Sequence, residues 1–325
     1  MKKGLMLTLL LALSVTFMSC QRGGGGAGGT ASNGAPRIAF VMKTANNPFF
    51  IEMQKGAEAE AKKLGVELVV QAAEREVDVE KQMQIVENLI QTRVAALCVT
   101  PSGSREIVPA VNKANAAGIP VVIVDTRVDA KALADAKGRV ATFIGSDNYE
   151  GGKLAGEFIA KSLNGKGKVA ILEGIPGHET GDSRIRGFRE ALKASPGIEI
   201  VASQTANWER DQGFNVFQNI LQSHPEVQAV FACSDLMALG ALEAIAAAKK
   251  TGQIMVVGFD ASDEARAAVT KGTMGATVAQ SPAQMGALAV ENAYHLIKGE
   301  PIKEEIVVPI KLITKENAGS SNPGK

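Results

Sequence analysis

The chain has 325 residues, of which 46% are hydrophobic and 21% charged, the composition of a globular protein with one large or two medium domains. Its formal net charge is +1, which becomes −1 when Lys2 and Lys3 are set aside as part of an N-terminal leader. A balance this close to neutral lacks the basic surface that nucleic-acid binding requires, so no nucleic-acid partner is expected.

The N-terminus has the pattern of an export signal. Two lysines precede an apolar run from Leu5 to Phe17, and a small residue precedes Cys20. The run is too short for a typical membrane span. Phe17-Met18-Ser19-Cys20 resembles a bacterial lipobox, with Phe17 where Leu is usual, and this predicts a lipoprotein signal peptide over residues 1–20 and a lipid anchor at Cys20. Plain secretion with cleavage nearby is the alternative.

Residues 21–36 consist mostly of Gly, Ala, Ser, Thr and Asn, which bury too little apolar area to offset the entropy of ordering. We expect them to form a flexible tether, and residues 318–325 to form a disordered tail. Cys98 and Cys233 lie in separate apolar runs, so each is expected to be a single buried thiol.

From residue 37 onward, short apolar runs alternate with amphipathic helical patterns, which is typical of repeated βα units. Eleven strands and about nine helices are too many for one sheet of average size, and they favour two doubly wound parallel-sheet lobes. The predicted helices are 49–64, 78–92, 104–117, 149–163, 183–194, 210–223, 235–250, 261–271 and 282–298. The predicted strands are 37–42, 66–71, 95–99, 120–124, 141–144, 167–173, 198–203, 228–233, 254–259, 274–279 and 305–310. No Pro/Gly/Ser-rich linker interrupts residues 37–317, so the chain is expected to cross between the lobes more than once and to leave a cleft.

Six apolar runs are followed by a residue that can hydrogen-bond to a sugar or stack on it. In an open parallel sheet the ligand lies outside the carboxyl ends of the strands, so these side chains are expected to converge on one crevice. The residues at these positions are Lys43, Asp125, Arg184, Ser234, Asp260 and Gln280.

Aromatic side chains occur next to these strand ends. In Asn46-Asn47-Pro48-Phe49-Phe50, Asn47 can cap a helix that begins at Pro48, Phe50 suits the core and Phe49 can face the cleft. Trp208 is the only tryptophan and lies in a polar stretch, which favours a ligand platform or a lid. These rings can stack on the apolar face of a pyranose or furanose.

The charged candidates indicate the kind of ligand. Carboxylate and guanidinium groups can each bind two neighbouring hydroxyls. Lys43 and Arg184 supply two positive charges against the two negative charges of Asp125 and Asp260, which suits a neutral polyhydroxylated ligand. Individually, each carboxylate could equally be a helix cap or a surface ion pair.

Signals for catalysis or cofactors are weak. His178, His224 and His295 show no metal-ligand spacing and are expected at the surface, although His178 could line the cleft mouth. No G-x-S-x-G, P-loop or G-x-G-x-x-G motif follows a strand, and Gly151-Gly152 is best explained by close helix packing. We therefore expect a binding protein without catalytic residues, metal or cofactor.

The chain resembles the type I periplasmic binding proteins of sugar ABC transporters, specifically the ribose/allose-binding group. The resemblance spans about residues 37–315, and its motifs are jointly specific. They are Lys43-Thr44-Ala45-Asn46-Asn47-Pro48-Phe49-Phe50, Ile144-Gly145-Ser146-Asp147-Asn148, Ala202-Ser203-Gln204 with Trp208, Asp235-Leu236-Met237-Ala238-Leu239-Gly240-Ala241, Val256-Val257-Gly258-Phe259-Asp260 and Thr277-Val278-Ala279-Gln280.

This resemblance implies two lobes joined by three crossovers near Ser146, Gln280 and Pro309. The N-terminal lobe would comprise 37–146 and 280–309, and the C-terminal lobe 147–279 and 310–317. It also implies a monomeric periplasmic or cell-surface protein that passes a monosaccharide to an ABC permease. By position, the sugar-contacting residues would be Lys43, Asn47, Phe49, Phe50, Asp125, Arg184, Trp208, Ser234, Asp260 and Gln280.

Four departures from the ribose binders favour a hexose or another polyol over ribose itself. Lys43 replaces a Ser and Trp208 replaces a Phe, both as in the allose-binding branch, while Thr126 replaces an Arg and Ser234 an Asn.

Three other functions are alternatives. An exported sensor of a sugar or furanosyl signal, docking a membrane receptor, would have the same architecture. A LacI-type regulator would need an N-terminal helix-turn-helix, whereas this N-terminus has an export leader. A sugar hydrolase would need an acid and a base carboxylate, and Asp125 and Asp260 are instead expected to bind Arg184 and hydroxyls.

Overall fold

The computed structural model describes residues 34–318 of the chain. The predicted signal peptide with Cys20, nearly all of the predicted tether and most of the predicted tail lie outside the described residues. Within residues 34–318, no helix combines the length and the apolar character needed to cross a membrane.

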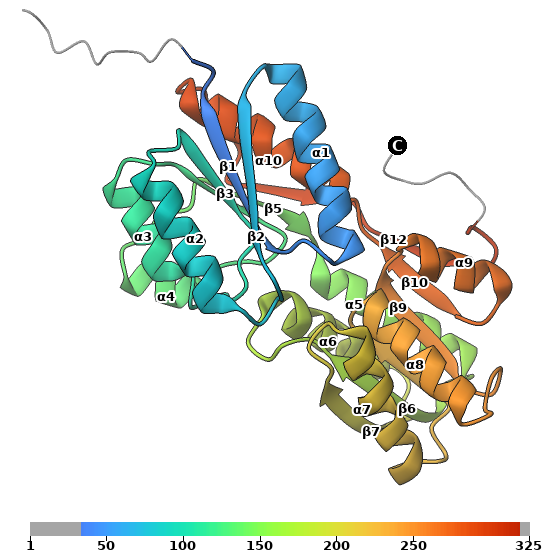
Figure 1. Ribbon diagram of the computed structural model, residues 1–325. Coiled ribbons are helices and arrows are strands. Elements are labelled where there is room, and N and C mark those ends of the chain that lie inside the picture. The colour runs from blue at the N-terminus through green and yellow to red at the C-terminus, as the bar shows by residue number, and fades with distance from the viewer. Residues whose placement is uncertain (1–33, 319–325) are drawn as a thin grey trace, which may run out of the picture. The chain divides into compact units, whose positions relative to one another are not determined.

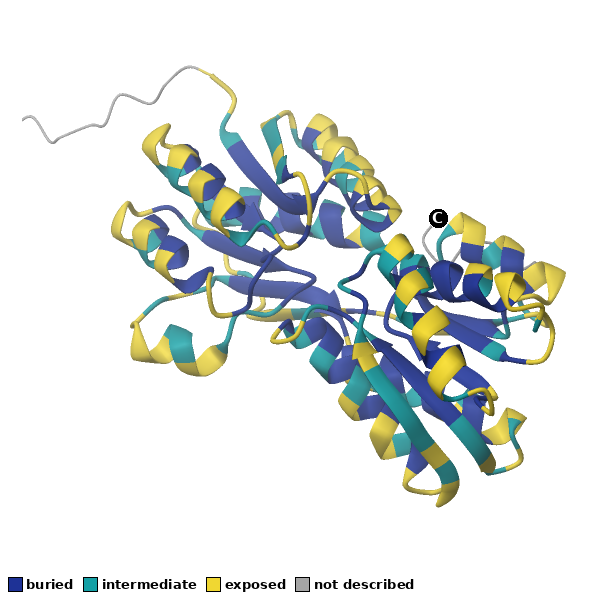
Figure 2. Cartoon of the chain, turned by 60° about the horizontal axis from the view of Figure 1, so that its bottom comes forward, coloured by how far each residue is buried: buried dark blue, intermediate teal, exposed yellow. Residues whose placement is uncertain are grey.

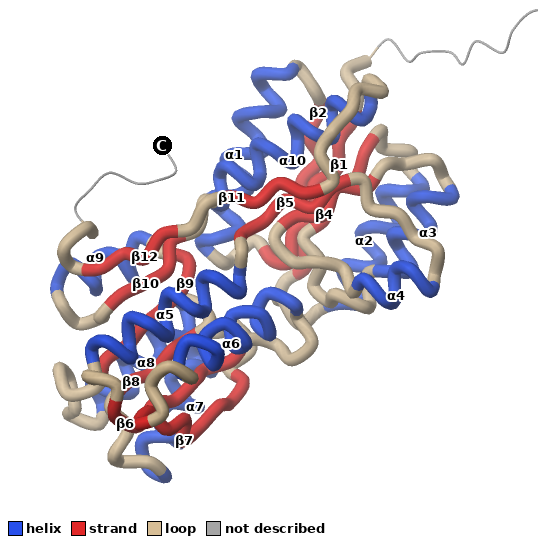
Figure 3. The backbone as a smooth tube through the Cα atoms, turned by 180° about the vertical axis from the view of Figure 1, so that it is seen from behind, coloured by secondary structure: helices blue, strands red, loops and turns tan. Residues whose placement is uncertain are grey.

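The described residues form two six-stranded sheets, each covered by helices on both faces (Figures 1 and 3). The first sheet has the order β11-β5-β4-β3-β1-β2 and the second β12-β10-β9-β8-β6-β7. All pairs are parallel except β10–β12. We call the part built on the first sheet the first lobe, and the part built on the second sheet the second lobe. Two doubly wound lobes are therefore confirmed.

The strands of the first sheet follow the predicted runs closely. They are β1 (Arg37–Thr44), β2 (Glu67–Ala73), β3 (Ala96–Val99), β4 (Val121–Val124), β5 (Thr142–Ser146) and β11 (Glu305–Val308). Those of the second sheet are β6 (Lys166–Glu173), β7 (Gly197–Thr205), β8 (Ala229–Ala232), β9 (Met255–Asp260), β10 (Ala276–Ala279) and β12 (Lys311–Thr314). The central strands β3, β4, β8 and β10 are buried at every residue, as sheets covered on both faces require.

Helices connect successive strands, and all of them except the short α4 bury one face, so that blue interiors and yellow outer faces alternate in Figure 2. They are α1 (Pro48–Leu64), α2 (Val79–Gln91), α3 (Val108–Ala116), α4 (Ala130–Asp135), α5 (Asn148–Ser162), α6 (Glu179–Leu192), α7 (Arg210–Ser223), α8 (Asp235–Ala247), α9 (Asp263–Lys271) and α10 (Pro282–Ile297). In the described part of the chain this is one helix and one strand more than predicted, because α4 and β12 had not been identified.

The chain passes between the two sheets at three places. It leaves the first sheet after β5, and α5 packs against β9 and β10. It leaves the second sheet after β10, and α10 packs against β3 and β4. Finally, β11 adds to the edge of the first sheet and β12 to the edge of the second, with only two residues between them. Figure 3 shows these connections side by side.

The predicted close packing at Gly151 and Gly152 is confirmed. A Cβ atom added at Gly152 would lie 2.0 Å from the carbonyl oxygen of Arg184 on α6, and one at Gly151 would lie 2.6 Å from the ring of Phe259. Because Gly152 has no side chain, α6 packs closely against α5. This contact fixes the position of the backbone that carries Arg184.

Candidate functional site

One narrow cavity of about 30 Å³ collects side chains from the strand ends and helix starts of both lobes. Its lining consists of Lys43, Asn47, Phe49, Phe50, Glu76, Asp125, Thr180, Arg184, Trp208, Ser234, Asp260 and Gln280. The carboxyl ends of the strands thus face one crevice, as the parallel topology predicts.

The start of α1 forms an aromatic wall. Asn47 caps the helix, since its Oδ1 accepts a hydrogen bond from the Phe49 backbone N–H at 3.0 Å. The rings of Phe49 and Phe50 pack edge to face, with centroids 5.3 Å apart, and both line the cavity. Phe50 lies in the core and Phe49 lines the cavity, as predicted, but the two roles are shared, because both rings belong to the core and to the cavity wall.

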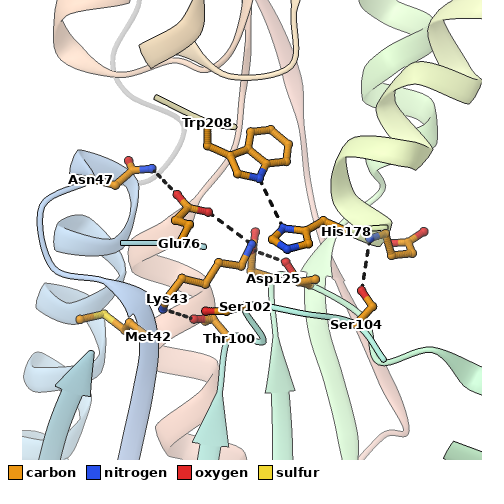
Figure 4. Close-up of polar contacts among 12 residues, drawn as sticks. Met42, Lys43, Asn47, Glu76, Thr100, Ser102, Ser104, Asp125, His178 and Trp208 are labelled. Atoms are coloured by element: carbon orange, nitrogen blue, oxygen red, sulfur yellow. Dashed lines mark hydrogen bonds and ion pairs between the residues drawn. The ribbon is translucent and has the colours of Figure 1, made fainter. Parts of the chain in front are cut away.

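A buried charge cluster lies next to this wall (Figure 4). Lys43 is only 2% exposed. Its Nζ atom lies 3.4 Å from Asp125 Oδ2 and 3.7 Å from Glu76 Oε2. Glu76 also accepts a hydrogen bond from Asn47 Nδ2 at 3.0 Å, and Asp125 accepts one from the Thr126 hydroxyl at 2.9 Å. Burial raises the pKa of Glu76, while the neighbouring Lys43 and the Asn47 amide act against this rise.

Arg184 occupies the corresponding place in the second lobe. Its Nη1 donates to the carbonyl of Cys233 at 2.6 Å and its Nε donates to Asn148 Oδ1 at 2.8 Å. The guanidinium stacks on Phe259, 3.7 Å from the ring centroid, and lies 5.7 Å from that of Trp208. These contacts hold the planar group in one orientation, 3.9 Å from Asp260.

Asp260, Gln280 and Asp235 lie at the end of the second sheet. Gln280 donates from Nε2 to Asp260 Oδ1 at 2.8 Å. Burial raises the pKa of Asp260 to about 8, against the opposing effect of Arg184. Asp235, which accepts hydrogen bonds from Thr277 and the Ser262 backbone, has its pKa raised to about 7 by burial.

Trp208 is held from several sides. A Cβ atom on Gly174 would lie 1.9 Å from the indole and one on Gly181 would lie 3.1 Å away, so the ring lies on two glycines. Its Nε1–H donates to Nδ1 of His178 at 3.4 Å (Figure 4).

Two buried polar atoms of the lining have no hydrogen-bond partner among the described residues. They are the hydroxyl oxygen of Thr180, on the first turn of α6, and the amide oxygen of Gln280. A buried polar atom without a partner costs free energy, so these two atoms mark where a ligand with hydroxyl groups would be stabilised.

The structure brings all ten predicted contact residues to this one cavity and adds Glu76 and Thr180. With Glu76, three carboxyl groups face two cations, so the predicted balance of two against two leaves out one titratable group of the lining. Burial raises the pKa values of both Glu76 and Asp260, which reduces the negative charge that these two carboxyl groups carry.

The expected surface position of His178 is also wrong. It is 3% exposed and precedes α6 directly, whereas the helix was predicted to begin only at residue 183. Cys98 and Cys233 are buried thiols, as predicted.

Comparison with known proteins places this architecture in a family. Residues 38–301 match the family model described as a periplasmic binding protein domain. The chain belongs to this periplasmic binding protein family. It is 42% identical over 279 residues to the ribose import binding protein RbsB of Bacillus subtilis (strain 168), covering 86% of this chain and 87% of the relative.

Two further relatives bear on the site. The D-allose-binding periplasmic protein of Escherichia coli (strain K12) is 39% identical over 263 residues, covering 81% of this chain and 85% of the relative. A solved ABC transporter periplasmic solute binding protein from Actinobacillus succinogenes 130z, with bound D-allose, is 40% identical with a TM-score of 0.84. That match covers 88% of this chain and all of the solved one. These relatives are solute-binding proteins rather than enzymes, and the family implies a location outside the cytoplasm.

Proposed function

We propose that this periplasmic binding protein captures a neutral monosaccharide between its two lobes and delivers it to an ABC permease. The observation that carries the proposal is the joint lining of the cavity, which combines three aromatic rings with charged groups from both lobes. It also contains two buried polar atoms that have no partner within residues 34–318.

Each component suits a pyranose or furanose. Phe49, Phe50 and Trp208 offer flat apolar surfaces to the C–H faces of a sugar ring. Asp125 and Arg184 offer paired acceptors and donors in a plane, which match neighbouring hydroxyls. A ligand that contacts both lobes stabilises their closed arrangement through its differential affinity for it, and the closed surface then docks on the permease.

An aldohexose or ketohexose is the proposed ligand, in preference to ribose. The carboxylate of Glu76 and the hydroxyl of Thr180 extend the polar lining beyond the contacts that the family resemblance implies. Lys43 lies between Glu76 and Asp125 and can donate to a further hydroxyl.

The remaining parts of the proposal concern the whole chain. We propose a first lobe of residues 37–146 and 280–309 and a second lobe of residues 147–279 and 310–317. Cys20 is the proposed lipid anchor, and the protein acts as a monomer, which leaves the lobes free to open.

A thermal-shift screen of neutral pentoses and hexoses, followed by calorimetric titration, tests the proposal. A ligand at one hundred times its dissociation constant adds about 2.7 kcal/mol of stability. We expect such a shift with a hexose, and expect it to disappear in Arg184→Gln but to persist in Arg186→Gln, an exposed arginine on the same helix. A response confined to acidic sugars or amino acids would contradict the proposal.

A further inference from the structure

His178 connects the proposed ligand platform to the opposite lobe. It belongs to the second lobe and accepts a hydrogen bond from the indole N–H of Trp208 at 3.4 Å. Its imidazole also lies close to the backbone of Ser102, which belongs to the first lobe and follows β3. The next residue reinforces this contact, because the Glu179 backbone N–H donates to the Ser104 hydroxyl at 3.2 Å (Figure 4).

The hydrogen bond from Trp208 fixes the protonation state of the imidazole. The indole N–H is a donor only, so Nδ1 of His178 must be an unprotonated acceptor. A proton on Nδ1 would place two donors against each other and break the contact with Trp208. The contact therefore requires a neutral ring.

We propose that His178 is a positioning residue for Trp208 and a contact between the lobes, so that the lobes hold their ligand firmly only while its imidazole is neutral. This inference rests on the proposed capture of a sugar and goes beyond it, because it predicts release in acid.

The charges around His178 favour the neutral ring. Burial lowers the imidazole pKa from 6.5 to about 3, and the Lys43 cation of the first lobe acts in the same direction. Other titratable groups from the neighbouring elements are Asp125 and Glu76, which pair with Lys43, Glu179 and Asp182 on α6, Glu209 beside Trp208, and Arg184 facing the indole.

The direction of the pH effect follows from the difference between the imidazole pKa in this structure and its ordinary value in water. When the lobes open, His178 meets water and its pKa returns towards 6.5. The open state then takes up a proton that the closed state excludes, so acid favours opening. Sugar affinity is fully present above pH 6.5 and falls as the pH drops below it, by about tenfold between pH 7.5 and pH 5.5.

Two variants separate this effect from the titration of the site carboxylates. His178→Asn keeps an acceptor oxygen for Trp208 but cannot be protonated in this range. His224→Asn is the matched control, because His224 is a partly exposed histidine of the same lobe. We expect the ratio of dissociation constants, variant to wild type, to change about tenfold between pH 7.5 and pH 5.5 for His178→Asn and to stay constant for His224→Asn, with D-allose and D-ribose as probes.

Trp208 provides a second readout that needs no sugar. It is the only tryptophan of the chain, so intrinsic fluorescence reports on it alone. We expect an emission change on acidification in the wild type that is absent from His178→Asn. Identical emission curves and identical pH profiles of affinity in the two proteins would overturn the inference. Failure of every sugar to bind the wild type at pH 7.5 would instead refute the proposed function, and the emission curves would still test the contact.

Discussion

Two aspartates hold equivalent positions in the two lobes. Asp125 follows β4 and Asp260 ends β9, and these strands occupy the same place in their sheets. Both residues have a positive φ, 64° and 115° respectively, which is uncommon outside glycine and asparagine. Backbone strain of this kind concentrates at functional sites, and here it aims both carboxylates at the same cavity.

Substitutions at Asp125 can separate the effect of its charge from the effect of its backbone conformation. Asparagine tolerates φ near 64° but lacks the charge, so Asp125→Asn should weaken sugar binding by roughly 10- to 100-fold, as expected for one charged hydrogen bond of about 1.5–3 kcal/mol. Asp125→Ala should cost about 1 kcal/mol more in unfolding free energy, because alanine strains the left-handed backbone. Calorimetric titration and thermal denaturation measure the two effects. Asp135→Asn, on the exposed helix α4, should change neither, and equal affinity of Asp125→Asn and wild type would refute the assigned role.

Asp260 predicts a pH dependence of stability. Its folded-state pKa of about 8 lies above the ordinary value of 3.8, so folding favours the protonated form. This carboxyl imposes no penalty below pH 3.8, and the penalty grows as the pH rises to about 8. Thermal denaturation should therefore show that Asp260→Asn gains stability relative to wild type as the pH rises from 4 to 8. A constant difference across that range would contradict the burial argument.

The residues that face the cavity were predictable where they follow a strand end or carry an aromatic ring. Glu76, Thr180 and His178 were not, for physical reasons. Glu76 lies in a polar loop three residues after β2, where its surroundings do not distinguish it from an exposed charge. Thr180 and His178 lie at a helix start that has no apolar periodicity, so the local pattern does not predict that they are buried.

Three helix pairs pack through glycines that face each other. In the pair α5–α6, a Cβ atom on Gly187 would lie 1.9 Å from the carbonyl of Tyr149, just as one on Gly152 would contact Arg184. The pairs α1–α10 and α7–α8 repeat the arrangement, with Gly56 and Gly286 in the first and Gly213 and Gly240 in the second. Since α1, α6 and α8 begin at the cavity, these close contacts fix where their first turns lie.

A methyl group at such a contact should separate the helices. Gly152→Ala is expected to destabilise the fold by about 1–3 kcal/mol, because the added carbon would lie 2.0 Å from a backbone oxygen that cannot move independently. It should also weaken sugar binding by displacing Arg184. Gly34→Ala is the control, since a Cβ atom there meets nothing within 4 Å. An unchanged melting temperature in Gly152→Ala would show that the helices can move apart without cost.

Element prediction succeeded where hydrophobic periodicity was long and failed where it was short. The helix 210–223 is predicted correctly, because Phe214, Phe217, Ile220 and Leu221 recur at helical spacing within it. The six-residue helix α4 has no buried residue, and only two residues separate the four-residue strand β12 from β11. Neither leaves a periodic pattern that could separate it from a loop.

At the scale of the whole molecule, the two lobes act together only if the chain segments between them permit opening. The three crossings are short, and each lies directly beside a strand end. Among the described residues, few polar contacts hold the lobes together. One of them is the hydrogen bond from the Glu179 backbone N–H to the Ser104 hydroxyl. Few contacts leave the balance between open and closed states to the ligand.

A crosslink at this contact tests whether closure retains the ligand. The Glu179 backbone nitrogen lies 3.2 Å from the Ser104 hydroxyl, so Ser104→Cys with Glu179→Cys should form a disulfide on oxidation, faster when sugar is present. Cys20→Ser removes the one cysteine that precedes the described residues. Cys98 and Cys233 are buried, and burial raises the pKa of Cys233 to about 12, so neither of them should react. Non-reducing electrophoresis measures the formation of the disulfide, and stopped-flow Trp208 fluorescence measures sugar release. We expect release to slow at least tenfold in the oxidised protein and to recover on reduction. Each single-cysteine variant should release sugar at the wild-type rate, whereas unchanged release from the crosslinked protein would mean that the sugar leaves without separation of the lobes.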